Sequence, residues 1–245
     1  MKIAVIADIH GNIPAFEAVL RDIEARGADR VICLGDMVGK GPNSRAAIDL
    51  CRRHCDEIVI GNWEHVLFHY YVRLCQGDAH DITERMCWFI DEIGDERMEF
   101  AAALPHSTEF TLGGKLVRLF HAHPQNFNRY FPDSPLEQRA ELFGYSEKSR
   151  EKRESDIAVY ADIHRPYDQT LSGRRLINVG SVGNPLDVPR ASYAVIEDDG
   201  GDADVQFVRV DYDIDRAVEL ARRHDTPDLD GYIAELRNAE YFRRR

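Results

Sequence analysis

No run of apolar residues in this chain is long enough to cross a membrane, because none approaches the roughly 18 residues that a spanning helix needs. The first eight residues, MKIAVIAD, also turn polar too early for the apolar core of a secretory signal peptide. These two absences predict a cytoplasmic protein that has no membrane partner.

Cysteine is scarce and unevenly placed. The five cysteines all lie before residue 88, and an odd number crowded into one part of a chain argues against a disulfide framework. Cys51 and Cys55 are four residues apart, but no second pair completes a structural zinc site. We therefore expect buried, reduced thiols.

Basic residues are outnumbered, with 31 Lys and Arg against 43 Asp and Glu and a formal net charge of −12. Surfaces that grip nucleic acid need clustered Lys and Arg, so the composition argues against bulk nucleic-acid binding. A small phosphorylated substrate remains compatible, because a bound dication can reverse the charge of a site. The 245 residues, of which 44% are hydrophobic, predict a single domain over 1–245.

Strand-like and helix-like patterns alternate in the N-terminal part of the chain. Continuous apolar runs predict buried strands at 3–7, 31–34 and 57–60. Helical spacing predicts one helix between Asn12, its cap, and Gly27, its stop, and a second helix at 44–54. This βαβαβ series predicts parallel strands with right-handed crossovers.

The rest of the chain mixes helices with strands. No convincing strand lies between about 64 and 104, which predicts a helical insertion that either forms a wall near a site or packs on the sheet edge. A hairpin turn is expected at Gly113-Gly114, and a helix at 135–143 with Ser134 as its cap. Four further strands are expected at 157–160, 175–179, 193–197 and 205–210. Two amphipathic helices are expected at about 213–242.

Side chains that bind hard metal ions follow the expected strands. In chain order they are Asp8, His10, Asp36, Asn62, His121, His123, Asp162 and His164. A lone Asp after a strand is usually a cap and a lone His is usually a satisfied core or surface residue. The carboxyl ends of strands converge on one crevice, however, so five such clusters together predict one metal site. In the Asp8-Ile9-His10 segment, a spacing of two can place carboxylate and imidazole on one side of an extended chain.

The ligand types indicate which ions would bind. Carboxylate, amide and imidazole groups without thiolate suit Mn, Fe, Zn, Ni or Co, and we favour Mn. A carboxylate can bridge two such ions about 3.5 to 4 Å apart, which then bind a nucleophile and the substrate oxygens. The pattern predicts two divalent cations and a metal-bound hydroxide that attacks phosphorus.

These residues, in this order, resemble the calcineurin-like metallophosphoesterase superfamily and, within it, small bacterial phosphoesterases. The matching segments are ADIHGN, LGDMVGKGPN, GNWE, HAHP, ADIHRP and NVGSVGNPLDVPRASYAV, which span residues 1 to about 196. The resemblance implies an α/β fold: a four-layer αββα sandwich of two mixed sheets with flanking helices. It also implies hydrolysis of a small phosphomonoester or phosphodiester.

The resemblance implies two metal positions that share Asp36. One would be held by Asp8, His10, Asp36 and His164, and the other by Asp36, Asn62, His121 and Asp162. Asp162 stands where the family has histidine. It is either a ligand that adds a negative charge or a side chain that points elsewhere and leaves the second ion weakly bound.

Trp63 is the second departure from the family pattern. A histidine at this position is thought to contact the scissile phosphate and to act as a general acid. Indole has an N–H donor but no accessible proton-transfer pKa, so its presence should slow the loss of alkoxides far more than that of phenolates or phosphates. His123 is a candidate replacement acid; the alternative is that it only supports the site through a hydrogen bond.

Two classes of function stay open. The first is a phosphoesterase in which Asp36, Asn62 and His123 take part in catalysis. The second is a catalytically weakened metal-binding or partner-binding module of the same fold, a reading favoured by Trp63 and Asp162. The sequence leaves the oligomeric state undetermined.

Overall fold

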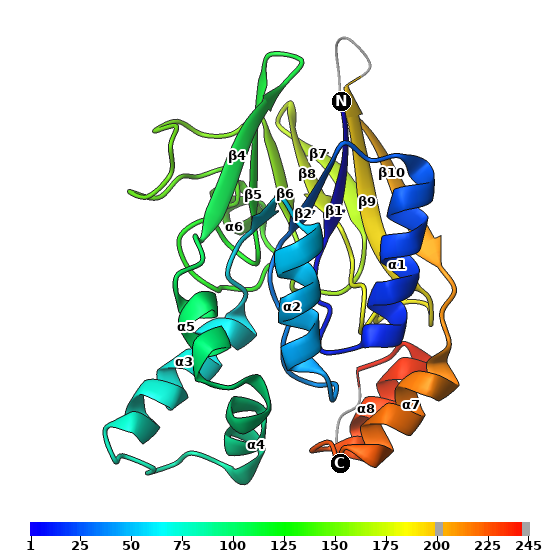
Figure 1. Ribbon diagram of the computed structural model, residues 1–245. Coiled ribbons are helices and arrows are strands. Elements are labelled where there is room, and N and C mark those ends of the chain that lie inside the picture. Colours follow the sequence, from blue (N-terminus) through cyan, green and yellow to red (C-terminus); the bar gives the residue numbers. More distant parts are fainter. Residues whose placement is uncertain (199–202, 242–245) are drawn as a thin grey trace.

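Two five-stranded sheets form the centre of the computed structural model, which describes residues 1–198 and 203–241 (Figure 1). The strands of the first sheet are β1 (Lys2–Ile6), β2 (Arg30–Cys33), β3 (Glu57–Ile58), β9 (Ala191–Asp198) and β10 (Ala203–Val210). Those of the second are β4 (Ser107–Leu112), β5 (Lys115–Phe120), β6 (Ile157–Tyr160), β7 (Tyr167–Leu171) and β8 (Arg174–Asn178). The strand orders are β10-β9-β1-β2-β3 and β4-β5-β6-β8-β7.

The βαβαβ series is confirmed in the first sheet. β1, β2 and β3 are parallel neighbours, connected by α1 (Ile13–Arg26) and α2 (Ser44–His54). The Asn12 side chain caps α1 by accepting from the backbone N–H of Ala15 at 3.3 Å, and Gly27 ends the helix at φ 64°. β3 is shorter than expected, because Ile60 leaves the sheet and its N–H donates to the Pro105 carbonyl.

Apolar side chains fill three layers between the elements. Ile3, Val5 and Ile32 of the first sheet meet Val117 and Val159 of the second in a fully buried core. The other face of the first sheet packs against α1, α2 and the insertion helices. The outer face of the second sheet is covered by the segment around the short helix α6 (Leu136–Glu141). The predicted sandwich of two mixed sheets with flanking helices is therefore confirmed.

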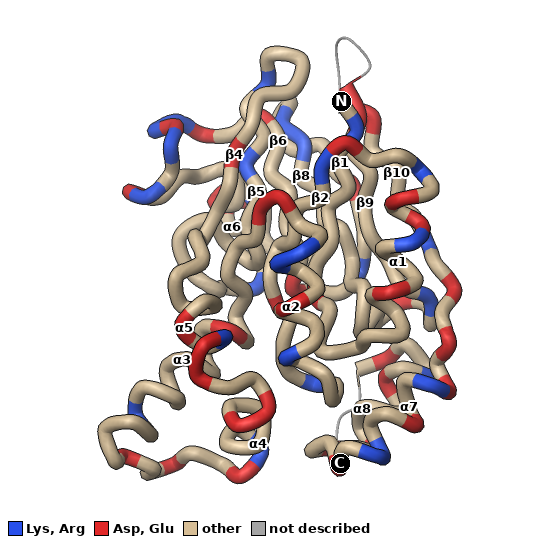
Figure 2. The backbone as a smooth tube through the Cα atoms, viewed as in Figure 1, with Lys and Arg blue, Asp and Glu red and all other residues tan. Residues whose placement is uncertain are grey.

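Helices gather beyond the carboxyl end of β1 (Figure 1). The insertion contributes α3 (Asn62–Cys75), α4 (Glu84–Ile93) and α5 (Asp95–Ala102), and the C-terminal part contributes α7 (Ile214–Arg223) and α8 (Leu229–Asn238). The expected C-terminal end at 242 lies outside the described residues. Acidic and basic residues are interspersed along α1, α7 and α8 (Figure 2). None of the described helices is long and apolar enough to span a membrane.

One local prediction was wrong, and one strand was missed. The hydroxyl of Ser134 does not cap α6; it accepts from the N–H of Phe131 at 2.8 Å in the preceding turn, which leaves α6 without a side-chain cap. The strand β7 was not predicted, although it pairs with β8 in an antiparallel hairpin whose turn contains Ser172 and Gly173, both with positive φ.

Candidate metal centre

The two DxH segments share an unusual backbone conformation. Asp8 and His10 have φ values of 52° and 48°, and Asp162 and His164 have values of 65° and 58°. The expectation of an extended segment at Asp8-Ile9-His10 was wrong, because Asp8 and His10 are left-handed, as are Asp162 and His164. Each such residue costs about 1 to 2 kcal/mol for most side chains, so the surrounding contacts must hold these turns in place.

Two neighbouring loops hold the turn that follows β1. On one side, the backbone N–H groups of Asp8, His10 and Gly11 donate to the carbonyls of Gly35, Asp36 and Met37 at 3.0, 3.0 and 2.9 Å. On the other side, the hydroxyl of Ser181 and the N–H of Gly183 donate to the Asp8 carbonyl at 2.8 and 2.9 Å. A Cβ atom at Gly183 would lie 1.8 Å from the Ile9 carbonyl oxygen, so no larger residue fits there. The GSVG segment (180–183) thus supports the loop after β1 that contains Asp8 and His10.

Glu64 joins the loop after β2 to the start of α3. Its buried carboxylate accepts from four backbone N–H groups, those of Asp36 (2.9 Å), Met37 (2.7 Å), Val38 (3.2 Å) and Gly61 (2.9 Å). Asp36 in turn accepts from the N–H of Trp63 at 2.8 Å through Oδ1. This leaves Asp36 Oδ2 to face the cluster.

Three buried histidines are fixed in one tautomer by backbone carbonyls. The Nδ1 atoms of His10, His121 and His164 lie 2.9, 2.8 and 2.5 Å from the carbonyl oxygens of Val38, Leu34 and Asn184. A carbonyl oxygen can only accept, so each Nδ1 carries a hydrogen and Nε2 of the neutral ring presents a lone pair.

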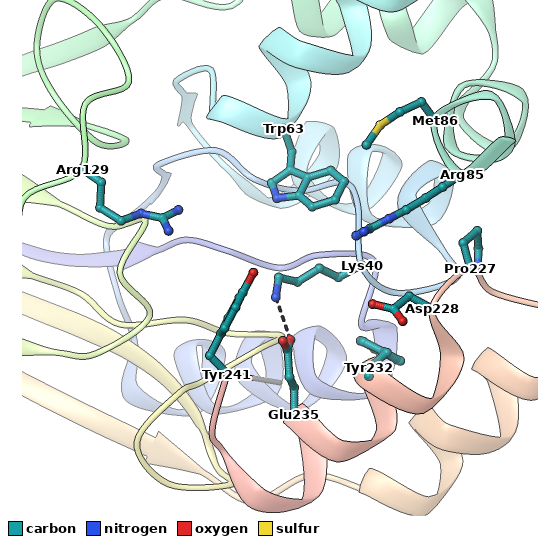
Figure 3. Close-up of a pocket in the computed structure, with 11 residues that line it drawn as sticks. Lys40, Trp63, Arg85, Met86, Arg129, Pro227, Asp228, Tyr232, Glu235 and Tyr241 are labelled. Atoms are coloured by element: carbon teal, nitrogen blue, oxygen red, sulfur yellow. Dashed lines mark hydrogen bonds and ion pairs between the residues drawn. The ribbon is translucent and has the colours of Figure 1, made fainter. Parts of the chain in front are cut away.

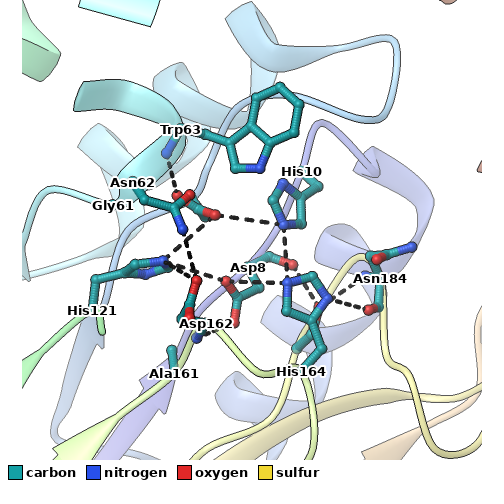
Figure 4. Close-up of polar contacts among 12 residues, drawn as sticks. Asp8, His10, Gly61, Asn62, Trp63, His121, Ala161, Asp162, His164 and Asn184 are labelled. Atoms are coloured by element: carbon teal, nitrogen blue, oxygen red, sulfur yellow. Dashed lines mark hydrogen bonds and ion pairs between the residues drawn. The ribbon is translucent and has the colours of Figure 1, made fainter. Parts of the chain in front are cut away.

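These lone pairs point at other acceptors (Figure 4). The Nε2 atoms of His10 and His164 face one another at 3.2 Å. His121 Nε2 lies 3.5 Å from Asp36 Oδ2, and neither this nitrogen nor Asp8 Oδ1 has a hydrogen-bond partner among the described residues. Buried acceptors that face each other are unfavourable unless a proton or a cation lies between them. The residues therefore fit divalent cations.

The ligand atoms form two overlapping groups. Those of Asp8, His10 and His164 lie within 4.8 Å of one another, and so do those of Asp8, Asp36 and His121. Asp8 belongs to both groups. Asp36 Oδ2 lies 3.7 Å from His10 Nε2 as well as 3.5 Å from His121 Nε2, so both carboxylates lie near histidines of both groups.

Asp162 lies beside the second group and is engaged by Arg129. Arg129 donates to both carboxylate oxygens, at 2.5 Å from Nε and 2.7 Å from Nη2, and the amide of Asn62 donates to Oδ1 at 2.7 Å. Burial opposes ionisation of Asp162, but the hydrogen bonds from Arg129, together with the imidazole of His121 nearby, hold its pKa below the usual range. Asn62 thus reaches the cluster through Asp162, whose Oδ1 lies 3.6 Å from His121 Nε2.

Arg129 was missed by the sequence reasoning. It lies in the irregular segment between β5 and α6, where no strand or helix period marks one residue as inward-facing. Its guanidinium binds Asp162, which lies 33 residues further along the chain. A contact over this sequence separation leaves no local pattern in the sequence.

The contacts described for His123 lie outside the cluster. Its Nδ1 accepts from the N–H of Gln125 at 3.1 Å, its Nε2 lies 3.8 Å from Glu141, and its ring contacts Tyr130. None of the contacts described for His123 involves a candidate ligand, so its proposed role as a proton donor stays a prediction.

Trp63 packs at the edge of the cluster. Its ring centroid lies 6.0 Å from that of His10 and 5.7 Å from that of Phe89. A Cβ atom at Gly39 would lie 2.3 Å from the indole, so glycine is required for this approach. Trp63, Asp36 and Asp162 also line a cavity of about 370 Å³ that opens beside the candidate ligands.

Comparisons with known proteins identify the family. Residues 1–201 match the calcineurin-like phosphoesterase superfamily domain, and the chain belongs to that superfamily. An uncharacterized protein of Methanocaldococcus jannaschii is 31% identical, over 92% of this chain and 94% of that protein.

Two solved structures share the fold. A metallophosphoesterase from Sphaerobacter thermophilus is 26% identical with a TM-score of 0.74, over 96% of this chain and 98% of that one. A hypothetical protein from Pyrococcus horikoshii is 21% identical with a TM-score of 0.75, over 96% and 97% of the two chains. The second likeness shows the fold alone.

Replacing Glu64 with Gln should lower the free energy of unfolding by about 2 to 3 kcal/mol, because an amide has one acceptor oxygen and its NH₂ would face backbone donors. Denaturant unfolding of Glu64→Gln, with Glu99→Gln on an exposed face of α5 as the control, measures this effect. A loss no larger than that of the control would contradict the anchoring role.

Cation binding should weaken as the pH falls. Burial raises the pKa of Asp36 to about 7 in the metal-free protein. Burial alone would lower the pKa of His121, but Asp36, Asp162 and Asp8 raise it well above its usual value. Below these pKa values protons occupy the ligands and a cation must displace them. Calorimetric titration with Mn²⁺ between about pH 6 and 8 should show that affinity rises with pH and that fewer protons are released on binding as the pH rises. An affinity that does not depend on pH would contradict this account.

Proposed function

We propose that this chain is a divalent-metal-dependent phosphoesterase that hydrolyses a small phosphate ester. One observation carries the proposal: buried carboxylates and the Nε2 atoms of buried histidines converge, and no described residue supplies a hydrogen bond to His121 Nε2 or Asp8 Oδ1. The chain that holds this cluster belongs to a phosphoesterase superfamily. The adjoining cavity leaves room for a phosphoryl group beside these atoms.

The donor set suits two ions, with Mn²⁺ favoured. Asp8, His10 and His164 would hold one, and Asp8, Asp36 and His121 the other, with Asn62 and Asp162 alongside. When bound, such ions neutralise phosphate charge and lower the pKa of a water molecule.

The chain's own residues orient the reacting groups. The carbonyl contacts of the three histidines keep each Nε2 directed at the cluster. Asp36 is held by the N–H of Trp63 in the first turn of α3, and Glu64 fixes the start of this helix by accepting from the N–H of Gly61. Arg129, about half-exposed, lines the cavity and can donate to phosphate oxygens. The preorganised donors would act where charge develops on the phosphoryl group.

The alternative, a catalytically weakened binding module, has one observation in its favour. Arg129 already satisfies both oxygens of Asp162 at the position where the superfamily has a histidine ligand. If that contact displaced the second ion, the protein would bind metal without efficient hydrolysis.

Metal-dependent turnover separates the two functions. Mn²⁺-loaded protein should hydrolyse 4-nitrophenyl phosphate or its diester, and Asp36→Asn should reduce kcat/KM by about 10²-fold or more because a charged ligand is lost. Asp91→Asn, on an exposed part of α4, is the matched control. Bound metal without hydrolysis of either activated ester would favour the binding module.

Trp63→His should raise kcat/KM for an alkyl phosphate by up to about 10²-fold, and for 4-nitrophenyl phosphate much less, because only the poor leaving group needs a proton. Trp63→Phe changes the packing against Phe89 without adding an acid and serves as the control. An equal gain on both esters would contradict the missing-acid account.

A further inference from the structure

A second cavity of about 300 Å³, here called the outer cavity, adjoins the one beside the cluster (Figure 3). The two cavities share Lys40, Trp63, Arg129 and Tyr241. The outer cavity extends from these residues to α4 of the insertion and to α8 of the C-terminal part. A molecule at the cluster could therefore reach between the two groups of helices.

Cations concentrate around the outer cavity. Lys40, Arg85 and Arg129 line it together with two carboxylates, Asp228 and Glu235. Lys40 donates to Glu235 at 2.7 Å. Arg129 is in addition bonded to both oxygens of Asp162, so Arg85 is the cation on which the attraction of an anionic occupant depends.

Arg85 is the cation at this cavity that forms no ion pair with any described residue. Its guanidinium lies 5.3 Å from the ring of Trp63, and Figure 3 shows it reaching from α4 into the cavity. Its Nε is buried without a hydrogen-bond partner, and no ion pair joins Arg85 to any other described residue. A structural role as a cover for the indole explains the ring contact but leaves this buried donor unsatisfied.

We propose that the outer cavity binds the leaving group of the substrate and that this leaving group carries a phosphate, so that the scissile bond is a phosphoanhydride. The inference rests on the proposed phosphoesterase function. A phosphate leaves without a proton, which suits a site that has Trp63 in place of a general acid. Phosphate oxygens also match the planar fork of a guanidinium.

The reaction is an ordinary hydrolysis. The oxygen of water forms a bond to the phosphorus beside the metal cluster, and the bond from that phosphorus to the bridging oxygen breaks. The electron pair leaves with the second phosphate, whose charge Arg85 and Arg129 stabilise. The protons of water pass to the product phosphates and to solvent.

The test compares ADP and inorganic pyrophosphate, which have anionic phosphate leaving groups, with 4-nitrophenyl phosphate on the Mn²⁺-loaded full-length chain. Arg85→Gln should reduce kcat/KM for the two anhydrides at least about tenfold more than for the aryl ester, as expected for one charge-assisted contact. Arg85→Lys keeps the charge without the fork and should restore part of the loss. Arg53→Gln, on an exposed part of α2, should change none of the three values.

The outcomes separate the inference from the function on which it rests. Hydrolysis of the aryl ester with no turnover of either anhydride, or an equal loss on all three substrates in Arg85→Gln, would overturn the leaving-group assignment alone. Absence of hydrolysis of all three substrates would overturn the phosphoesterase function and the inference with it. Weaker competitive inhibition by AMP in Arg85→Gln than in wild type, at an unchanged melting temperature, would support the assignment independently of turnover.

Discussion

Buried negative charge beside unprotonated imidazole nitrogen is the constraint on which this structure depends. Asp8 and Asp36 are almost wholly buried, and the imidazole nitrogen of His121 that they face presents a lone pair to them whenever its ring is neutral. Such a cluster is unfavourable in a dry interior unless cations or protons neutralise it. A bound cation would therefore lower the free energy of the buried cluster as well as supply chemistry to the site.

The supporting loops hold the cluster against that cost. Left-handed turns direct the DxH side chains inward, the GSVG segment supports the first turn, and Glu64 collects backbone donors from two loops. Each contact lies at the carboxyl end of a strand or the start of a helix, where backbone groups are not used by the sheet. The regular elements supply a rigid frame, and the irregular loops supply the chemistry.

Local patterns in the sequence predicted much of this arrangement. The βαβαβ series, the capped helix after Asn12 and the order of the candidate ligands all depend on short-range spacing, which a single sequence carries. The prediction of an extended conformation at Asp8-Ile9-His10 was wrong, because left-handed φ values leave no periodic pattern in the sequence. The strand β7 was missed although Ser172-Gly173 gave a turn signal. Arg129 and Arg85 act through contacts set by the tertiary fold, so the sequence alone did not single them out.

The structure also changes the interpretation of Trp63. The residue packs against Gly39 and Phe89, yet it borders both cavities, so it forms part of the wall of the candidate site. The central claim, that the cluster binds divalent cations, is tested most directly by anomalous diffraction from crystals grown with Mn²⁺. We predict a peak among Asp8, His10 and His164 and a second beside Asp36 and His121; the absence of any peak, with His10 and His164 still facing one another, would contradict the account.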